Sequence, residues 1–140
     1  MNKLLEIALG QVGITEIKGD VDNPEVMKYY HETGRKWVGH DETPWCDAFL
    51  DWCAMRAGYK FSPGLLARAW LKEGTGIANP KLGDICILWR KSKDSIYGHV
   101  GIFIRKNSDA VWLLGGNQGI GQVNIRPYSL NKVLGYRRLT

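Results

Sequence analysis

The hydrophobic pattern changes its period after Gly74-Thr75-Gly76, and this change constrains the fold more than any other feature. Before it, apolar residues recur at helical spacing, which predicts helices over 2–13, 24–33, 44–57 and 64–72. After it, short apolar or alternating runs are separated by turn residues, which predicts strands over 84–89, 99–104, 110–114, 122–126 and 133–137. Helices followed by consecutive strands indicate the α+β class, with N-terminal helices packed on a C-terminal antiparallel sheet of about five strands.

The chain length and the lack of any internal boundary in the sequence predict one domain, spanning residues 1–140. The chain has 140 residues, enough to bury a core, and it contains no repeat, linker or low-complexity segment. Six Trp and six Tyr are generous for this size, and most are expected in the core or along a groove.

The charge balance favours an anionic partner. A net charge of +5 and a pI of about 9.2 suit nucleic acid, an acidic membrane surface or an anionic cell wall. The tightest basic cluster, Arg90-Lys91-Ser92-Lys93, is too short for a nucleic-acid-binding stripe and is interpreted as a solvated turn. We therefore expect no nucleic-acid partner.

The three cysteines predict free thiols. Cys46 and Cys53 share one predicted helix, so their Cα atoms would be about 10 Å apart at ~1.5 Å per residue, too far for a disulfide. The absence of a C-x-x-C pair argues against a zinc knuckle, and the overall pattern fits a reduced, cytosolic protein.

Nothing in the sequence predicts membrane insertion. No apolar run approaches the ~20 residues that a membrane-spanning helix needs. The N-terminal run 1–9 is interrupted by Glu6, so it is expected to be an amphipathic helix and not a signal peptide. A monomer without a cofactor or a metal is expected.

The stretch Thr43-Pro44-Trp45-Cys46-Asp47-Ala48-Phe49 predicts a nucleophile at a helix start. Thr43 can cap the helix, and Pro44 suits its first position. Cys46 would then be about the third helical residue, where unpaired backbone N–H groups and the helix dipole favour a thiolate.

A base and an orienting group follow on two successive predicted strands. His99 opens one strand directly after Gly98, and the next strand runs back to deliver Gly115-Gly116-Asn117-Gln118 to the same end. Asn117 could accept the second imidazole N–H of His99 through its side-chain carbonyl. The order Cys, His, Asn is a plausible catalytic set, because a cysteine nucleophile needs a base that a third group orients.

Each of these residues also has a structural interpretation. A free cysteine is often a small core residue, a lone histidine is often structural, and Asn117 could be an ordinary turn residue. Trp45 and Trp70 could be core residues or a substrate platform, and with Gln118 they are the candidate substrate-binding residues.

These motifs resemble the CHAP and NlpC/P60-type cysteine peptidases, especially the small single-domain proteins of phages and bacteria. The likeness rests on four stretches in order: 43–49, 80–85, 98–101 and 114–118. It implies a papain-like α+β fold, cleavage of amide bonds in peptidoglycan, Cys46 as nucleophile, His99 as general base and Asn117 as orienting residue. The backbone N–H of Cys46 would contribute to the oxyanion hole.

The sequence departs from the family pattern at two positions near the site. Many CHAP domains have Gln immediately before the cysteine, where this chain has Trp45. Many also have Glu two residues before the Asn, where this chain has Gly115, which leaves Asn117 as the expected orienting residue. The acidic calcium loop of some CHAP domains is not evident, since only Asp41 and Glu42 lie in the relevant loop.

The resemblance predicts a peptidoglycan hydrolase, either a stem-peptide endopeptidase or an N-acetylmuramoyl-L-alanine amidase. A phage endolysin is expected, made in the host cytoplasm and released to the wall by another protein. A secretion-system effector amidase is the nearest alternative. A non-catalytic wall-binding module on the same fold, a nucleic-acid binder and a thiol acyltransferase are the others.

Overall fold

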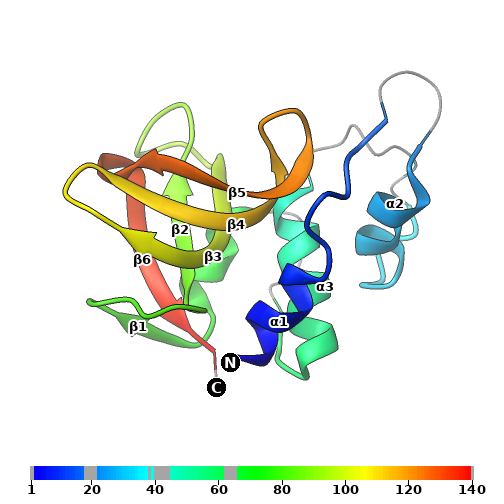
Figure 1. Ribbon diagram of the computed structural model, residues 1–140, viewed down its shortest axis with the longest axis horizontal. Coiled ribbons are helices and arrows are strands. Elements are labelled where there is room, and N and C mark those ends of the chain that lie inside the picture. The colour runs from blue at the N-terminus through cyan, green and yellow to red at the C-terminus, as the bar shows by residue number, and fades with distance from the viewer. Residues whose placement is uncertain (1, 18–21, 38, 40–44, 62–65, 140) are drawn as a thin grey trace.

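The protein, described by a computed structural model, places its helices beside a curved antiparallel sheet (Figure 1). The structure describes residues 2–17, 22–37, 39, 45–61 and 66–139. Within these ranges, the helices are too short or too polar for any of them to span a membrane.

The helical part comes first in the chain. It comprises α1 (Lys3–Leu9), α2 (Pro24–His31), α3 (Cys46–Ala57) and the 3₁₀ helix η1 (Ala67–Lys72). The strands are β1 (Thr75–Ile77), β2 (Ile85–Trp89), β3 (Gly98–Lys106), β4 (Ala110–Gln118), β5 (Gln122–Ser129) and β6 (Val133–Arg138), with the 3₁₀ turn η2 (Leu130–Lys132) before β6. The predicted α+β class is thereby confirmed.

All five predicted strands are present, and the structure adds β1, which the sequence prediction missed. β1 has only three residues and carries two polar or glycine positions, so its alternation is too short to detect. It pairs with β6 at the edge of the sheet, whose order is β1-β6-β2-β3-β4-β5.

Local sequence explains where the helices begin and end. The side chains of Asn2 and Asn23 accept hydrogen bonds from Leu5 N and Glu25 N, at 3.0 Å and 2.9 Å, and so cap α1 and α2. Gly58 ends α3 in the left-handed conformation, with φ of 85°.

The start of α3 differs from the prediction. Trp45 is its N-cap and makes no side-chain capping bond, so Cys46 is the first helical residue and not the third. The predicted cap Thr43 and the predicted first helical residue Pro44 lie outside the described residues.

The polar face of α3 is buried, whereas the sequence pattern placed only its apolar face inward. Asp47 and Asp51 are 2% and 0% exposed and face the buried Arg35. The Arg35 guanidinium bonds the Asp51 carboxylate and lies 3.8 Å from Asp47 Oδ2. Burial, and then the neighbouring Asp47, raises the pKa of Asp51. Removing one member of this buried group of charges would strongly destabilise the fold, because a buried charge would be left without a partner.

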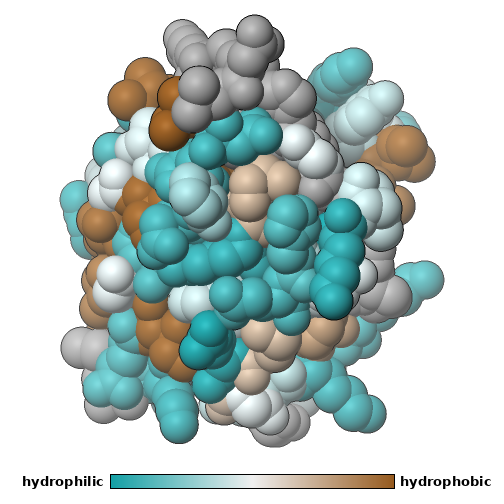
Figure 2. Space-filling view, turned by 90° about the vertical axis from the view of Figure 1, so that its right-hand side faces the viewer, coloured by the Kyte–Doolittle hydropathy of each residue, from teal (hydrophilic) through white to brown (hydrophobic). Residues whose placement is uncertain are grey.

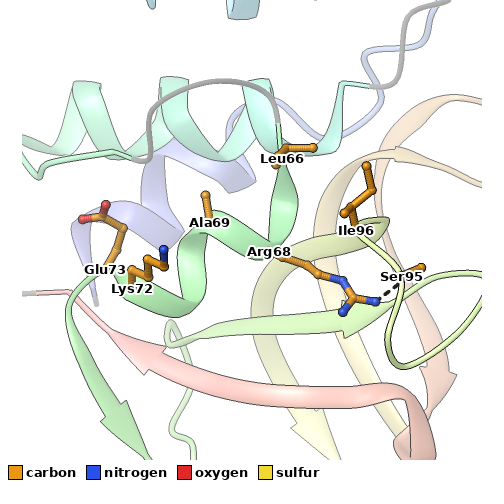
Figure 3. A pocket seen from close by; sticks show the side chains of 7 residues that line it. All are labelled: Leu66, Arg68, Ala69, Lys72, Glu73, Ser95 and Ile96. Carbon is orange, nitrogen blue, oxygen red and sulfur yellow. Dashed lines mark hydrogen bonds between the residues drawn. The ribbon is translucent and has the colours of Figure 1, made fainter.

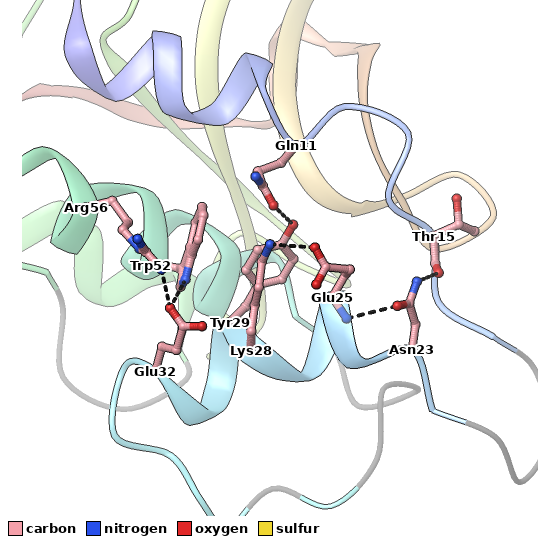
Figure 4. A network of polar contacts seen from close by, with 9 residues as sticks. All are labelled: Gln11, Thr15, Asn23, Glu25, Lys28, Tyr29, Glu32, Trp52 and Arg56. Atoms are coloured by element: carbon pink, nitrogen blue, oxygen red, sulfur yellow. Dashed lines mark hydrogen bonds and ion pairs between the residues drawn. The ribbon is translucent and has the colours of Figure 1, made fainter.

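Polar contacts join the three α-helices (Figure 4). Tyr29 of α2 donates to Gln11 Oε1 at 2.8 Å, beyond the end of α1. Trp52 Nε1 and Arg56 Nη2 of α3 both donate to Glu32 Oε1, at 2.9 Å and 2.7 Å. These bonds fix α2 against α3 and therefore hold the helix that carries Cys46.

A glycine lets α3 lie directly on the sheet. A Cβ at Gly116 of β4 would lie 2.6 Å from Phe49 Cβ and 2.8 Å from the Trp45 ring. Real Cβ atoms do not approach so closely, so only glycine permits this contact between α3 and the strand that leads to Gln118.

We predict that Gly116→Ala lowers the free energy of unfolding by about 1–3 kcal/mol, because the added methyl overpacks the helix–sheet contact. Denaturant unfolding measures it. Gly10→Ala is the matched control, since its Cβ would meet backbone oxygens no closer than 3.4 Å. Equal stability of the two variants would contradict a tight contact at Gly116.

Candidate active site

Cys46 lies at the first turn of α3, against the start of β3. The backbone N–H groups of Val100 and Asp47 act on its sulfur and lower the pKa of the thiol. Val100 directly follows His99, so Cys46 lies against the strand that carries the predicted base. Cys46 is 6% exposed, whereas Cys53 and Cys86 are fully buried, and all three thiols are free.

Gln118, and not Asn117, holds the imidazole of His99. His99 Nε2 lies 2.8 Å from Gln118 Oε1. The amide orientation is fixed on its other side, because Gln118 Nε2 donates to Leu113 O at 3.2 Å and to Asn124 O and Oδ1 at 2.9 Å and 3.0 Å. The oxygen must therefore face His99.

This orientation assigns the proton of the neutral imidazole. An amide oxygen can only accept, so His99 Nε2 carries the hydrogen. Nδ1 is then left with a free lone pair, and it is buried without a hydrogen-bond partner in the described part of the chain. An unprotonated imidazole nitrogen without a partner can act as a general base.

Gly115 explains why glutamine takes this place. A Cβ at Gly115 would lie 2.5 Å from Gln118 Oε1, so the amide occupies the space that a side chain at 115 would need. Gln118, three residues further on, thus occupies the space beside Gly115. The sequence interpretation noted Gly115 but assigned the orienting role to Asn117.

Asn117 itself sits in a turn-like conformation. Its φ is 57°, in the left-handed region that asparagine tolerates better than most residues, and its side chain is half-buried. This conformation turns the end of β4 so that Gln118 reaches His99. The backbone role of Asn117 was not predicted.

Tyr128 completes the surroundings of His99 and was missed in the sequence, because the predicted strand stopped at residue 126. Its hydroxyl oxygen lies 3.2 Å from His99 Nε2, and the two rings are 5.1 Å apart between centroids. Burial raises the pKa of Tyr128 to about 12, so it stays a neutral phenol.

Burial keeps the thiol and the imidazole neutral. It raises the pKa of Cys46 to about 11, helped by the charge of Asp47 and opposed by Arg90 and the two backbone N–H groups. It lowers the pKa of His99 to about 4, although the bond to Gln118 acts in the opposite direction. Between pH 4 and pH 11, approximately, Cys46 is therefore a thiol and His99 a neutral imidazole. The thiolate expected at the helix start is not the resting form.

The two candidate tryptophans are core residues. Trp45 and Trp70 are both 0% exposed, so neither offers a surface to a substrate in this structure. Trp45 stacks on Tyr29 at 5.8 Å, and its Nε1 finds no acceptor among the described residues. Trp70 Nε1 donates to Asp47 Oδ1 at 2.8 Å. This bond holds Asp47, the residue directly after the nucleophile, in place.

The described residues contain no group of three or more His, Cys, Asp or Glu side chains able to hold a metal. Asp41 and Glu42, the acidic residues of the predicted loop, lie outside the described ranges.

A pocket of about 470 Å³ lies between η1 and the β2–β3 turn (Figure 3). It is lined by Leu66, Arg68, Ala69, Lys72, Glu73, Ser95 and Ile96. Arg68 crosses from η1 to the turn and donates to Tyr97 O at 2.7 Å, Lys93 O at 2.9 Å and Ser92 O at 2.9 Å. The pocket does not include Cys46 or His99, but Arg68 holds the turn that leads into the strand of His99.

Sequence comparison decides the family. The CHAP domain profile matches residues 37–117, which is more than half of the chain and contains both Cys46 and His99. The chain belongs to the CHAP domain family. Members of this family are generally cysteine-dependent amidohydrolases. The matched range ends at Asn117, one residue before the side chain that orients His99 in this CHAP domain.

Two solved structures have a similar fold. The P60 domain of an antigen from M. avium paratuberculosis superposes with a TM-score of 0.55 at 15% identity, covering 99% of this chain and 91% of that one. A protein similar to lipoprotein of the NLP/P60 family, from Staphylococcus aureus subsp. aureus Mu50, superposes with a TM-score of 0.52 at 15% identity. The match covers 98% of this chain but 40% of the staphylococcal one. No curated protein matches the chain.

We predict that Gln118→Ala lowers kcat/KM by roughly 10–100-fold, less than the 10²–10⁴ that loss of a general base costs. The imidazole would lose the acceptor that fixes its tautomer. Asn117→Gly keeps the left-handed backbone and removes only the side chain, so its kcat/KM should stay within about threefold of wild type. Steady-state kinetics decides, and the opposite ranking would restore Asn117 as the orienting residue.

The pH dependence follows from the depressed pKa of His99. Because the imidazole stays neutral until the pH falls to about 4, kcat/KM should hold from neutral pH down to about pH 5 and decline below it. A pH–rate profile over the range in which circular dichroism shows folded protein measures this. An acid limb at the ordinary histidine pKa of about 6.5 would contradict a buried, neutral His99.

Proposed function

We propose that this CHAP domain hydrolyses amide bonds in peptidoglycan, either within the stem peptide or at its link to muramic acid. The observation that carries the proposal is the fixed imidazole of His99, with Nε2 at 2.8 Å from Gln118 Oε1 and Nδ1 free to act as a base, on the strand against which Cys46 lies. A buried imidazole nitrogen without a partner calls for an explanation, and a role as a base supplies one.

The first half of the reaction forms an acyl-enzyme. Cys46 Sγ attacks the amide carbonyl carbon while its proton passes to His99 Nδ1, so two buried neutral groups become an ion pair only as the new bond forms. The imidazolium then gives this proton to the leaving nitrogen, the C–N bond breaks, and a thioester remains on Cys46. In the second half, water attacks the thioester with His99 as base and releases the carboxylic acid and the thiol.

The helix start supplies a donor for the oxyanion. Cys46 is the first residue of α3, so its backbone N–H has no acceptor within the helix. Such a donor can stabilise the tetrahedral oxyanion, and the helix dipole adds to the effect. Trp45, where many relatives have Gln, is fully buried, so its side chain does not supply a second donor in this structure.

The surface suits an anionic wall polymer. The net charge is +5, and the face shown in Figure 2 is mainly hydrophilic with small, separate hydrophobic patches. The finer proposal is a phage endolysin, made in the host cytoplasm and acting on the wall after release. A secretion-system effector amidase is the alternative, with the same chemistry and a different route to the wall.

Digestion of purified peptidoglycan tests the proposal, with mass spectrometry of the fragments. Wild type should release soluble fragments, and their new termini identify the bond that is cut. Cys46→Ala and His99→Ala should each lose at least about 10³-fold in rate, because either change removes a reacting group. Cys53→Ala, which alters a buried thiol away from the site, is the control for loss of a cysteine.

Two results would contradict the proposal. Intact peptidoglycan after treatment with folded wild-type protein would exclude hydrolysis. Loss of turbidity of a peptidoglycan suspension at the same rate with Cys46→Ala as with wild type would favour a non-catalytic binding module. Amide exchange with an added amine, without net hydrolysis, would favour an acyltransferase instead.

A further inference from the structure

Two arginines lie on the side of the site formed by Tyr128. Arg90 follows β2, and Arg126 lies in β5 two residues before Tyr128. Both side chains are exposed, and neither guanidinium makes a hydrogen bond or an ion pair within the described part of the chain. Exposed cationic side chains next to reacting groups are candidates for ligand recognition.

Strand register places Arg90 on the sheet face of His99. Leu88 pairs with His99 across β2 and β3, and Arg90 lies two residues beyond Leu88, hence on the same side of an extended chain. Arg90 N donates to Tyr97 O at 3.1 Å, so the antiparallel pairing continues to this residue.

The charge of Arg90 reaches three groups of the site. It lowers the pKa of Cys46, of His99 and of Tyr128, in each case by less than burial shifts that pKa. At Cys46, Asp47 opposes Arg90 and has the larger effect, whereas at His99 and Tyr128 Arg90 acts without opposition from Asp47. Asp47 itself lies against Arg35 and accepts from Trp70.

Arg126 lies near Gln118 and Tyr128, the two residues that contact His99. Its guanidinium lies against Gly119, directly after Gln118, where a Cβ would be 2.7 Å from Arg126 Nη1. Leu113, the register partner of Arg126, and Val111, the partner of Tyr128, belong to the same buried cluster, so the arginine and the tyrosine share that face. Arg126 also lowers the pKa of Tyr128.

We propose that Arg90 and Arg126 bind a carboxylate of the substrate beside the amide that Cys46 attacks. Two exposed guanidinium groups that make no hydrogen bond or ion pair with other described residues match a carboxylate in charge and in hydrogen-bonding geometry. This inference rests on the proposed function for the nature of the substrate: peptidoglycan stem peptides carry free carboxylates that some wall chemistries convert to carboxamides. The arginines would then favour the carboxylate form.

The anion site can be tested without peptidoglycan, by alkylation of Cys46. The same thiolate attacks iodoacetate and iodoacetamide and displaces iodide from each, so the ratio of the two rates cancels changes in thiol reactivity and reports local charge. Arg90→Gln should lower the iodoacetate-to-iodoacetamide ratio by about two- to tenfold at low salt. Lys93→Gln, an equal change of charge in the same exposed turn, should leave the ratio within about 1.5-fold.

An unchanged ratio in Arg90→Gln, or an equal fall in Lys93→Gln, would overturn the proposal. Added salt should weaken the wild-type preference, because exposed charges are screened. Circular dichroism confirms that each variant is folded, and Arg90→Lys should retain part of the ratio if charge is what matters.

Matched stem peptides with a carboxylate or a carboxamide next to the cleaved bond extend the test. In Arg90→Gln and Arg126→Gln, kcat/KM for the carboxylate peptide should fall roughly tenfold, mainly through KM, with little change for the carboxamide peptide. Equal losses on both would overturn a carboxylate site. Failure of wild type to cleave either peptide or peptidoglycan would remove the hydrolase proposal, while a lowered alkylation ratio would still support anion binding at Arg90.

Discussion

The hydrogen bond between His99 and Gln118 is the interaction on which the site depends. It joins β3 to β4, and the three carbonyl oxygens around Gln118 Nε2 leave its oxygen no orientation except toward the imidazole. The neutral tautomer, and with it the free lone pair on Nδ1, follows from this single bond. Gly115 is the condition for it, because any side chain there would displace the amide.

The rest of the fold brings Cys46 to that imidazole and keeps it there. Gly116 lets α3 lie on β4 without an intervening side chain, while Asp47 and Asp51 bind the buried Arg35 on the other side of the helix. Trp70 ties Asp47 to η1, and Arg68 of η1 ties the β2–β3 turn to the same element. The nucleophile, the base and the arginine beside them are thus positioned by one connected set of contacts.

Much of the fold could be predicted from the sequence, because helical spacing, asparagine caps and alternating strands act locally. Cys46 and His99 stood out for the same reason, as each opens a regular element next to a glycine or a tryptophan. The partner of His99 could not be predicted in this way. Asn117 and Gln118 are adjacent, and the left-handed φ of Asn117 decides which of them reaches the imidazole. The burial of Trp45, Trp70 and Asp51 could not be predicted either, because it depends on tertiary contacts with residues far away in the sequence.

The central claim is that the resting His99 is neutral, with its hydrogen on Nε2 and a free lone pair on Nδ1. Nitrogen-15 NMR of histidine-labelled protein near neutral pH measures this directly, with His99→Gln used to assign the resonances. We expect a protonated Nε2 and an unprotonated Nδ1 for His99. A protonated Nδ1, in the other tautomer or in an imidazolium, would contradict the account.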